Sequence, residues 1–274
     1  MGFSVNTNTG AMAALQSLTA TNKGLGTVQN RINTGLSVAS TKDDSASFTI
    51  AQTLRGEVGG LKAVSSSLNR AKSTVDVAVA GAEQISDIVN QMKSKALEAS
   101  DDGLDAKSRA AINADFTALK EQITTIIKSS EFNGSNLLDS ASTATVAALQ
   151  STDPTDTLTV ANQGLDTMLT ADVTTADINS QANAEAMVGE LETFAGNLNT
   201  SLSTLGSASR KIDGQISFTS KLSDVIESGI GNLVDADLAK ESAKLQALQV
   251  KQQLGLQALS IANQAPQSIM SLFR

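Results

Sequence analysis

Between Ile50 and Ala99 every third or fourth residue is apolar, and only Glu57 interrupts the series. This spacing places one apolar stripe along a single helix, and a stripe this long without a stop signal is typical of coiled coils and helical arrays. Proline breaks helices, and the chain of 274 residues contains only two. The sequence therefore predicts long helices that pack through narrow apolar seams, with Gly59-Gly60 as a point where this helix bends.

Helical spacing also marks segments near 11–36, 112–126, 176–233 and 238–272. Gly35 suits the end of the first segment, and Ser40 to Asp44 suit the start of the next, because Gly favours helix ends and Ser, Thr and Asp favour helix starts. Asp235-Ala236-Asp237 marks a second joint near the C-terminus. The expected core of the long helices comprises Leu54, Leu61, Leu68, Ile85, Ile112, Phe116, Leu191, Leu198, Leu205 and Ile212.

Residues 140–176 are rich in Ser, Thr, Asp and Ala and predict a β-hairpin, with strands near 145–149 and 157–160 around Pro154. This hairpin reverses the chain, so helix 11–34 can pair with helix 238–272, and helix 44–100 with helix 178–233. The predicted fold is mainly α: an elongated bundle of long coiled-coil helices with a small β-hairpin, and with both termini at one end.

The two terminal helices carry more apolar surface than one chain can bury. Helix 238–272 is apolar on several faces, and a helix of that kind is buried on all sides. Alone, the pair should be frayed, because ordering costs about 1–2 kcal/mol per residue in backbone entropy. Contacts between copies that do not close into a ring build a helical filament. The expected assembly residues are Leu15, Leu18, Leu25, Ile32, Leu245, Leu248, Leu254, Leu256, Leu259 and Ile261.

Composition excludes several kinds of site. The chain has no Cys and no His, so thiolate and imidazole metal sites, Cys nucleophiles and Ser-His-Asp triads are ruled out. The net charge of −8 and the scattered basic residues argue against nucleic acid. We expect no catalytic, cofactor or metal site, and no membrane span, because the uncharged stretch 252–273 carries five Gln residues. The first fourteen residues lack the pattern of a cleavable signal peptide.

Motifs at both ends of the chain resemble those of bacterial flagellins. Five stretches match flagellin motifs in the same order. Near the N-terminus, Val5 to Asn8 resembles the opening I-N-T-N, and Arg31 to Ala46 resembles R-[LI]-x-[ST]-G followed by S-A-K-D-D-A-A. Further along, Phe132 to Leu138 resembles F-N-G-x-x-L-L, Asp235 to Glu241 resembles D-A-D-x-A-x-E, and Ala262 to Gln267 resembles A-N-Q-x-P-Q. The resemblance covers roughly residues 1–139 and 178–274.

The resemblance implies a structural subunit of the flagellar filament, with residues 1–40 and 235–274 forming the inner D0 coiled coil and residues 41–234 the D1 rod, including the hairpin. The joints would lie at Gly35, Lys42, Asp43, Asp44, Asp235 and Asp237. It further implies unfolded type III export, an extracellular filament of this chain alone or with other flagellins, an export chaperone on the last helix, and contacts with export-apparatus, junction and cap proteins.

Several alternatives remain at this point. Ser40 to Asp44 could be plain helix caps, and the whole chain could be a hook–filament junction protein or a generic coiled-coil adaptor. An enzyme insert of the H-E-x-x-H type needs His, which is missing. In many flagellins a segment like Q-R-V-R-E-L-A-V is read by Toll-like receptor 5. The matching positions here, Gln91, Lys93, Ser94 and Lys95, depart from it, so we expect weak or absent recognition.

Overall fold

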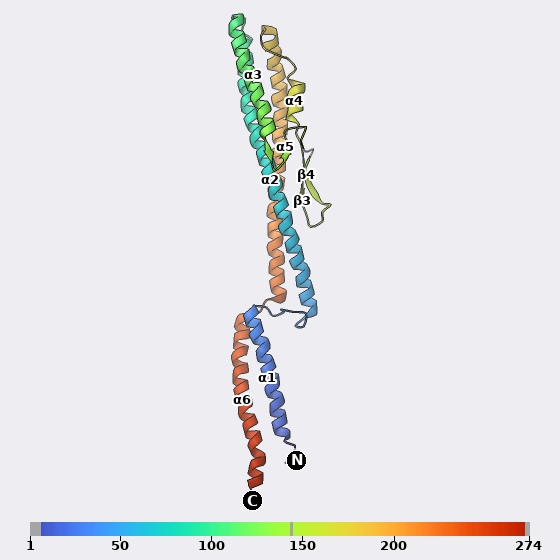
Figure 1. Ribbon diagram of the computed structural model, residues 1–274, viewed down its shortest axis with the longest axis vertical. Helices are drawn as coiled ribbons and strands as arrows, with labels where there is room; N and C mark the ends of the chain where they lie inside the picture. Colours follow the sequence, from blue (N-terminus) through green and yellow to red (C-terminus); the bar gives the residue numbers. More distant parts are fainter. Residues whose placement is uncertain (1–6, 143–144, 272–274) are drawn as a thin grey trace. The chain divides into compact units, whose positions relative to one another are not determined.

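The computed structural model describes residues 7–142 and 145–271. The chain divides into two compact units, a terminal unit of residues 1–56 and 225–274 and a middle unit of residues 57–224. The elements are the helices α1 (Thr9–Thr34), α2 (Ser45–Ala99), α3 (Ala106–Ser129), α4 (Leu165–Asp172), α5 (Gln181–Val234) and α6 (Leu238–Ser271), and the strands β1 (Glu131–Phe132), β2 (Ser135–Asn136), β3 (Thr145–Leu149) and β4 (Thr157–Ala161) (Figure 1). The predicted mainly α fold is confirmed.

The middle unit is built on the antiparallel packing of α2 against α5. Lys93 Nζ lies 2.6 Å from Glu192 Oε1, Lys72 pairs with Asp213, and the Ser209 hydroxyl donates to Asp76. These pairs keep one antiparallel register, so the apolar stripes of the two helices face each other. The predicted core residues of this unit are all buried: Leu61, Leu68, Ile85, Ile112, Phe116, Leu191, Leu198, Leu205 and Ile212. Leu54 is half-buried and belongs to the terminal unit.

Replacing Phe194, which is fully buried on α5, tests this core. We expect Phe194→Ala to lower the free energy of unfolding by about 3–5 kcal/mol, because the ring leaves a cavity that the long helices cannot close. Thermal unfolding followed by circular dichroism measures the effect. Phe218→Ala is the matched control: Phe218 lies on the same helix but is 58% exposed, so its loss should change stability by no more than about 0.5 kcal/mol.

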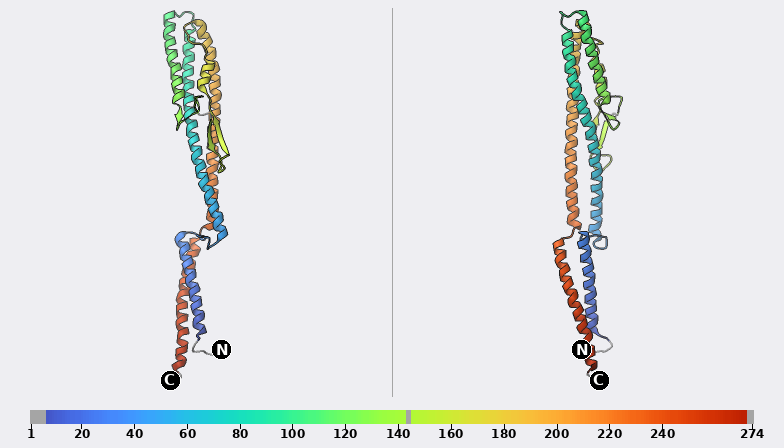
Figure 2. Two further views of the ribbon diagram at one scale, coloured as in Figure 1. Left: turned by 45° about the vertical axis from the view of Figure 1, so that its right-hand side comes forward. Right: turned by 60° about the vertical axis from the view of Figure 1, so that its left-hand side comes forward.

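The predicted hairpin is present as β3 and β4, which pair in antiparallel fashion from Thr145↔Ala161 to Leu149↔Thr157. It is held on the helices by two hydrogen bonds: the Leu149 amide donates to Ser67 Oγ on α2, and Gln215 Nε2 on α5 donates to the Gln150 carbonyl. Both views of Figure 2 place the hairpin beside the helices and α3 beside α2. Helix α4 follows the hairpin within 140–176, where the sequence predicted no helix.

A second, tighter turn joins β1 to β2 after α3. Asn133 and Gly134 both have positive φ, at 50° and 79°, as a two-residue type I′ hairpin turn requires, and Asn-Gly is a favoured pair there. The turn brings Leu137 and Leu138 into the core, where both are fully buried. Asn136 fastens the turn to α3, because its Nδ2 donates to the Ile127 carbonyl at 2.6 Å.

The start of α2 differs from the prediction in two respects. The apolar stripe runs through Ala51 and Val58, which are both buried, while Ile50 is 51% exposed. Glu57 is exposed as well, so it does not interrupt the buried stripe. Helix α2 continues without a break through Gly59 and Gly60, and a bend at this point stays a prediction. A Cβ at Gly60 would lie 2.8 Å from Thr152 Cγ2, so this glycine is explained by the close approach of the hairpin loop.

Candidate assembly surface

The terminal unit is centred on the antiparallel pair of α1 and α6, which lie side by side (Figure 1). Asn8 Nδ2, just before α1, donates to the Ala262 carbonyl near the end of α6 at 2.7 Å, so the two chain ends meet as predicted. The backbones approach closely because glycines face leucines. A Cβ at Gly24 would lie 3.7 Å from Leu248 Cδ1, and one at Gly255 would lie 3.3 Å from Leu18 Cδ1.

The predicted assembly residues fall into two groups. Those on the seam between the helices are half-buried: Leu18, Leu25, Ile32, Leu245, Leu248 and Leu259. The others point away from the partner helix and are exposed by 53–69%: Leu15, Leu254, Leu256 and Ile261. The pair therefore covers one face of each helix and leaves large aliphatic side chains on the others.

Leu15 lies outside the seam that α1 forms with α6. Thr21 and Val28 occupy the inner face, being 4% and 2% exposed, whereas Asn22 and Gln29 lie on the outside. Asn22 still contributes, since its Oδ1 accepts from Gln252 Nε2 at 2.8 Å. The inner face of α1 therefore combines the compact Thr21 with larger residues such as Leu18 and Leu25.

The exposed apolar surface extends along α1. Met12 is 66% exposed and borders, with Leu15, Gln16, Thr19, Ala20 and Lys23, an open hollow of about 510 Å³. Leu238 and Val250 of α6 are also at least half exposed. Within the described part of α1, only Thr21 and Val28 are buried. These exposed apolar side chains define the candidate assembly surface of α1 and α6.

The two chain segments that enter and leave the terminal helices are joined to each other. Gly35 ends α1 with φ at 71°, a left-handed conformation that glycine adopts without strain, and its carbonyl accepts from the Ala236 amide at 2.8 Å. Leu36 and Asp235 form an antiparallel bridge, and the Ser37 amide donates to the Val234 carbonyl at 2.7 Å. These bonds make a miniature two-stranded joint.

The predicted acidic joint residues act as local caps. Asp43 Oδ2 accepts from the Ser40 amide and hydroxyl, Asp44 Oδ1 accepts from the Ala46 amide to start α2, and Asp237 Oδ1 accepts from the Lys240 amide to start α6. Asp235 and Lys42 are exposed. Asp43, Asp44 and Asp237 thus accept local hydrogen bonds, and their role as joint residues stays a prediction.

The cap at Asp44 gives a pH-dependent prediction. The Ser47 hydroxyl, and then the Ser47 amide, hydrogen-bond to this carboxylate and lower its pKa below 3.8. A lowered folded-state pKa stabilises the fold above the unfolded value and loses that contribution as the pH falls through the folded value. The melting temperature of the parent should therefore exceed that of Asp44→Asn at neutral pH, and the gap should close as the pH falls through the lowered folded-state pKa of Asp44. A gap independent of pH would contradict the assignment.

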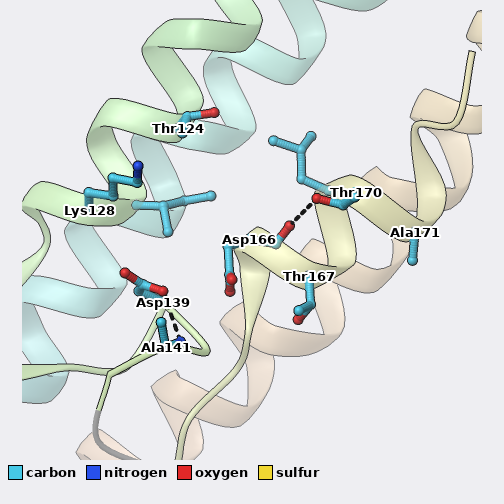
Figure 3. A pocket seen from close by; sticks show the side chains of 10 residues that line it. Thr124, Lys128, Asp139, Ala141, Asp166, Thr167, Thr170 and Ala171 are labelled. Carbon is cyan, nitrogen blue, oxygen red and sulfur yellow. Dashed lines mark hydrogen bonds between the residues drawn. The ribbon is translucent and has the colours of Figure 1, made fainter. Parts of the chain in front are cut away.

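A hollow of about 550 Å³ in the middle unit lies between α3, the loop after β2 and α4 (Figure 3). Lys128, Asp139 and Asp166 are its charged residues. Asp166 is already engaged, because its carboxylate accepts from the Ser140 amide at 2.7 Å and from the Ser140 hydroxyl. These hydrogen bonds connect α4 to the loop after β2, so Asp166 has a structural role.

Two further features of the described residues concern metal ions and membranes. Among residues 7–142 and 145–271, no three acidic side chains gather as metal ligands would. Within the same ranges, no helix combines the length and apolarity that crossing a membrane requires.

Comparison with protein families decides the relationship. The bacterial flagellin N-terminal helical region matches residues 5–143, and the flagellin C-terminal helical region matches residues 188–273. The chain belongs to the bacterial flagellin family. It is accordingly a structural filament subunit and not an enzyme.

Individual flagellins match over nearly their whole length. Flagellin FljK of Caulobacter vibrioides is 45% identical, over 99% of this chain and 98% of its own. A flagellin of Brucella melitensis is 37% identical over 99% of both chains. The crystal structure of Bacillus cereus flagellin is similar in fold, with a TM-score of 0.51 and 22% identity over 55% of this chain and 86% of its own.

The flagellin motifs coincide with the structural joints. The first half of S-T-K-D-D-S-A is the turn and cap before α2, and F-N-G lies at the β1–β2 turn. Val5, Asn6 and Leu272 lie outside the described residues. Arg31 and Glu241, which belong to motifs at opposite ends of the chain, form an ion pair of 3.3 Å that was not predicted as a site. Their joint presence in two flagellin motifs was the signal that could have suggested it.

The segment aligned with the receptor-recognised stretch has both of its lysines in ion pairs. Lys93 pairs with Glu192 of α5, and Lys95 lies 3.4 Å from Asp115 of α3 and 3.5 Å from Glu98. Glu98 and Asp115 raise the pKa of Lys95, so its charge stays paired. Gln91 and Ser94 are exposed.

Proposed function

We propose that this flagellin polymerises through the exposed apolar faces of α1 and α6, and that the terminal pair forms the inner layer of an extracellular filament. The observation that supports the proposal is the contrast between the two units. In the middle unit the long helices bury their apolar stripes, whereas Leu15, Leu254, Leu256 and Ile261 remain exposed in the terminal unit. Covering such side chains stabilises contacts between copies by about 25 cal/mol per Å² of apolar surface.

Electron microscopy of the purified protein after addition of a kosmotropic salt tests the proposal. Salt screens the repulsion expected from a net charge of −8 and strengthens apolar burial, so filaments should form. Protein that stays dispersed at high concentration and high salt would refute the proposal. The family relationship favours a filament subunit over a hook–filament junction protein, and recovery of the chain as a major component of sheared filaments would separate the two.

The proposal extends to export. Leu254 of α6 is free to meet a chaperone, but Leu245, Leu248 and Leu259 are half-buried against α1. We infer that an export chaperone binds α6 only with α1 displaced, consistent with transit in an unfolded form. Export-apparatus, junction and cap proteins complete the proposed set of partners. The D0 and D1 regions would meet at the joint of residues 35–44 and 235–237.

Recognition by Toll-like receptor 5 should be weak or absent. Ser94 and Lys95 replace an acidic residue and a leucine of the recognised stretch, and Lys95 is held by Glu98 and Asp115. A receptor reporter-cell assay with a strongly recognised flagellin as reference measures this. A response equal to the reference would contradict the prediction.

A further inference from the structure

The ion pair of Arg31 and Glu241 is the charged contact across the α1–α6 seam. Arg31 Nη1 lies 3.3 Å from Glu241 Oε1, and the Glu241 side chain is only 9% exposed. Lys244 Nζ is the next cation, 3.9 Å from the same oxygen. Arg31 Nε and Glu241 Oε2 are buried and have no hydrogen-bond partner among the described residues. A buried charge that is incompletely paired costs stability, so its presence needs a reason other than stability.

The close packing of Gly24 against Leu248 and of Gly255 against Leu18 also depends on the axial position of the helices. The inner face of α1 further carries Leu25, Val28 and Ile32, which follow one another with helical spacing. A slide of seven residues that brings position 17 to the place of position 10 would bring Arg31 to the place of Gly24, against Leu248. Three polar contacts describe a single register: Arg31 with Glu241 next to the joint, Asn22 with Gln252 in the middle, and Asn8 with the Ala262 carbonyl at the far end.

We propose that Arg31 and Glu241 are a positioning pair that fixes the axial register of α1 against α6. A slide of seven residues moves one helix by about 10.5 Å past the other, so that Glu241 loses Arg31 and keeps only the longer contact of 3.9 Å to Lys244 on its own helix. A single polar contact at a seam position specifies register in coiled coils in the same way, at a cost in stability. The register matters for the proposed function, because it sets where Leu15 on α1 lies relative to Leu254 and Ile261 on α6, and hence the shape of the surface that a second copy meets.

Cysteine cross-linking can read the register directly, since the chain has no Cys of its own. A Cβ at Gly10 would lie 4.0 Å from the Ala262 Cβ, within the range of a disulfide. The variant G10C/A262C therefore reports the register of the structure. The variant S17C/A262C reports a slide of seven residues, because position 17 would then take the place of position 10.

Each reporter is placed in the otherwise unchanged chain and in the R31M/E241L background, where neither charge remains. In the unchanged chain G10C/A262C should oxidise at least about tenfold faster than S17C/A262C, which corresponds to about 1.4 kcal/mol between the registers. In R31M/E241L this preference should fall severalfold. The charge-swapped background R31E/E241R restores an opposite-charge pair and should recover the preference.

An unchanged preference in R31M/E241L would overturn the proposal. Loss of the preference in both R31M/E241L and R31E/E241R would assign the effect to packing of the arginine stem, and would overturn it as well. The ratio of the two cross-links is measured on the full-length monomer. Failure of the unchanged chain to form filaments would refute the proposed function and leave this ratio unaffected, so the two failures are distinguishable.

Discussion

A chain cut to residues 41–234 will stay monomeric under the salt and protein concentrations at which the intact chain forms filaments. The cut removes α1 and α6, and with them the exposed Leu15, Leu254 and Ile261. What remains carries its apolar stripes inside the middle unit, where Leu68, Leu191 and Phe194 are fully buried. Without the terminal faces, contacts between copies lose the apolar area that offsets the entropy of association.

Sedimentation and electron microscopy of the two chains side by side measure this effect. Circular dichroism is the control, because the shortened chain should keep a cooperative thermal transition from the core of residues 57–224. A shortened chain that remains folded and still gives long tubes would show that the middle unit carries the assembly contacts.

The long helices of the middle unit could be predicted from the sequence because a single physical signal dominates there. Along α2 and α5, residues such as Leu68, Leu198 and Ile212 recur with helical spacing, and nothing but burial explains that repetition. The ends of the helices could also be predicted from the sequence. Asp44 caps α2 and Gly35 ends α1 for reasons of local hydrogen bonding that do not depend on tertiary structure.

The phase of the α1 seam could not be predicted from apolarity. Leu15 is more hydrophobic than Thr21, yet Thr21 is buried because its hydroxyl is satisfied by the Ser17 carbonyl and its small size allows close packing. Helix α4 was missed for a different reason. With eight residues it is too short to show periodicity, and its position depends on the bonds from Ser140 to Asp166, which join residues far apart in the sequence.

The division of the terminal leucines into inner and outer groups also needed the structure. In α6, Leu254, Leu256 and Leu259 lie within six residues of one another, so composition alone cannot say which of them meets α1. The partner helix decides it: Leu259 turns to the seam, while Leu254 and Leu256 face outward. That division separates residues that hold the monomer together from residues available to other copies.

The double variant L254Q/I261Q should therefore fold like the parent and fail to polymerise normally. Both side chains are exposed, by 58% and 69%, so the unfolding free energy should change by no more than about 0.5 kcal/mol for each. In a filament that buries them, each loses about 1.5–3 kcal/mol of burial. Since about 1.4 kcal/mol is a factor of ten, the critical concentration for assembly should rise by at least about a hundredfold.

The matched control is L97Q/F218Q, which removes two side chains of the middle unit that are equally exposed, at 63% and 58%. Pelleting of filaments over a range of protein concentrations gives the critical concentration for each chain. If exposure alone made a residue important, the two variants would behave alike. If the terminal helices carry the assembly surface, only L254Q/I261Q shifts the critical concentration strongly. If L254Q/I261Q had the same critical concentration as the parent, Leu254 and Ile261 would remain exposed to solvent in the filament. A buried glutamine could not replace the apolar contacts of leucine or isoleucine without a cost in free energy.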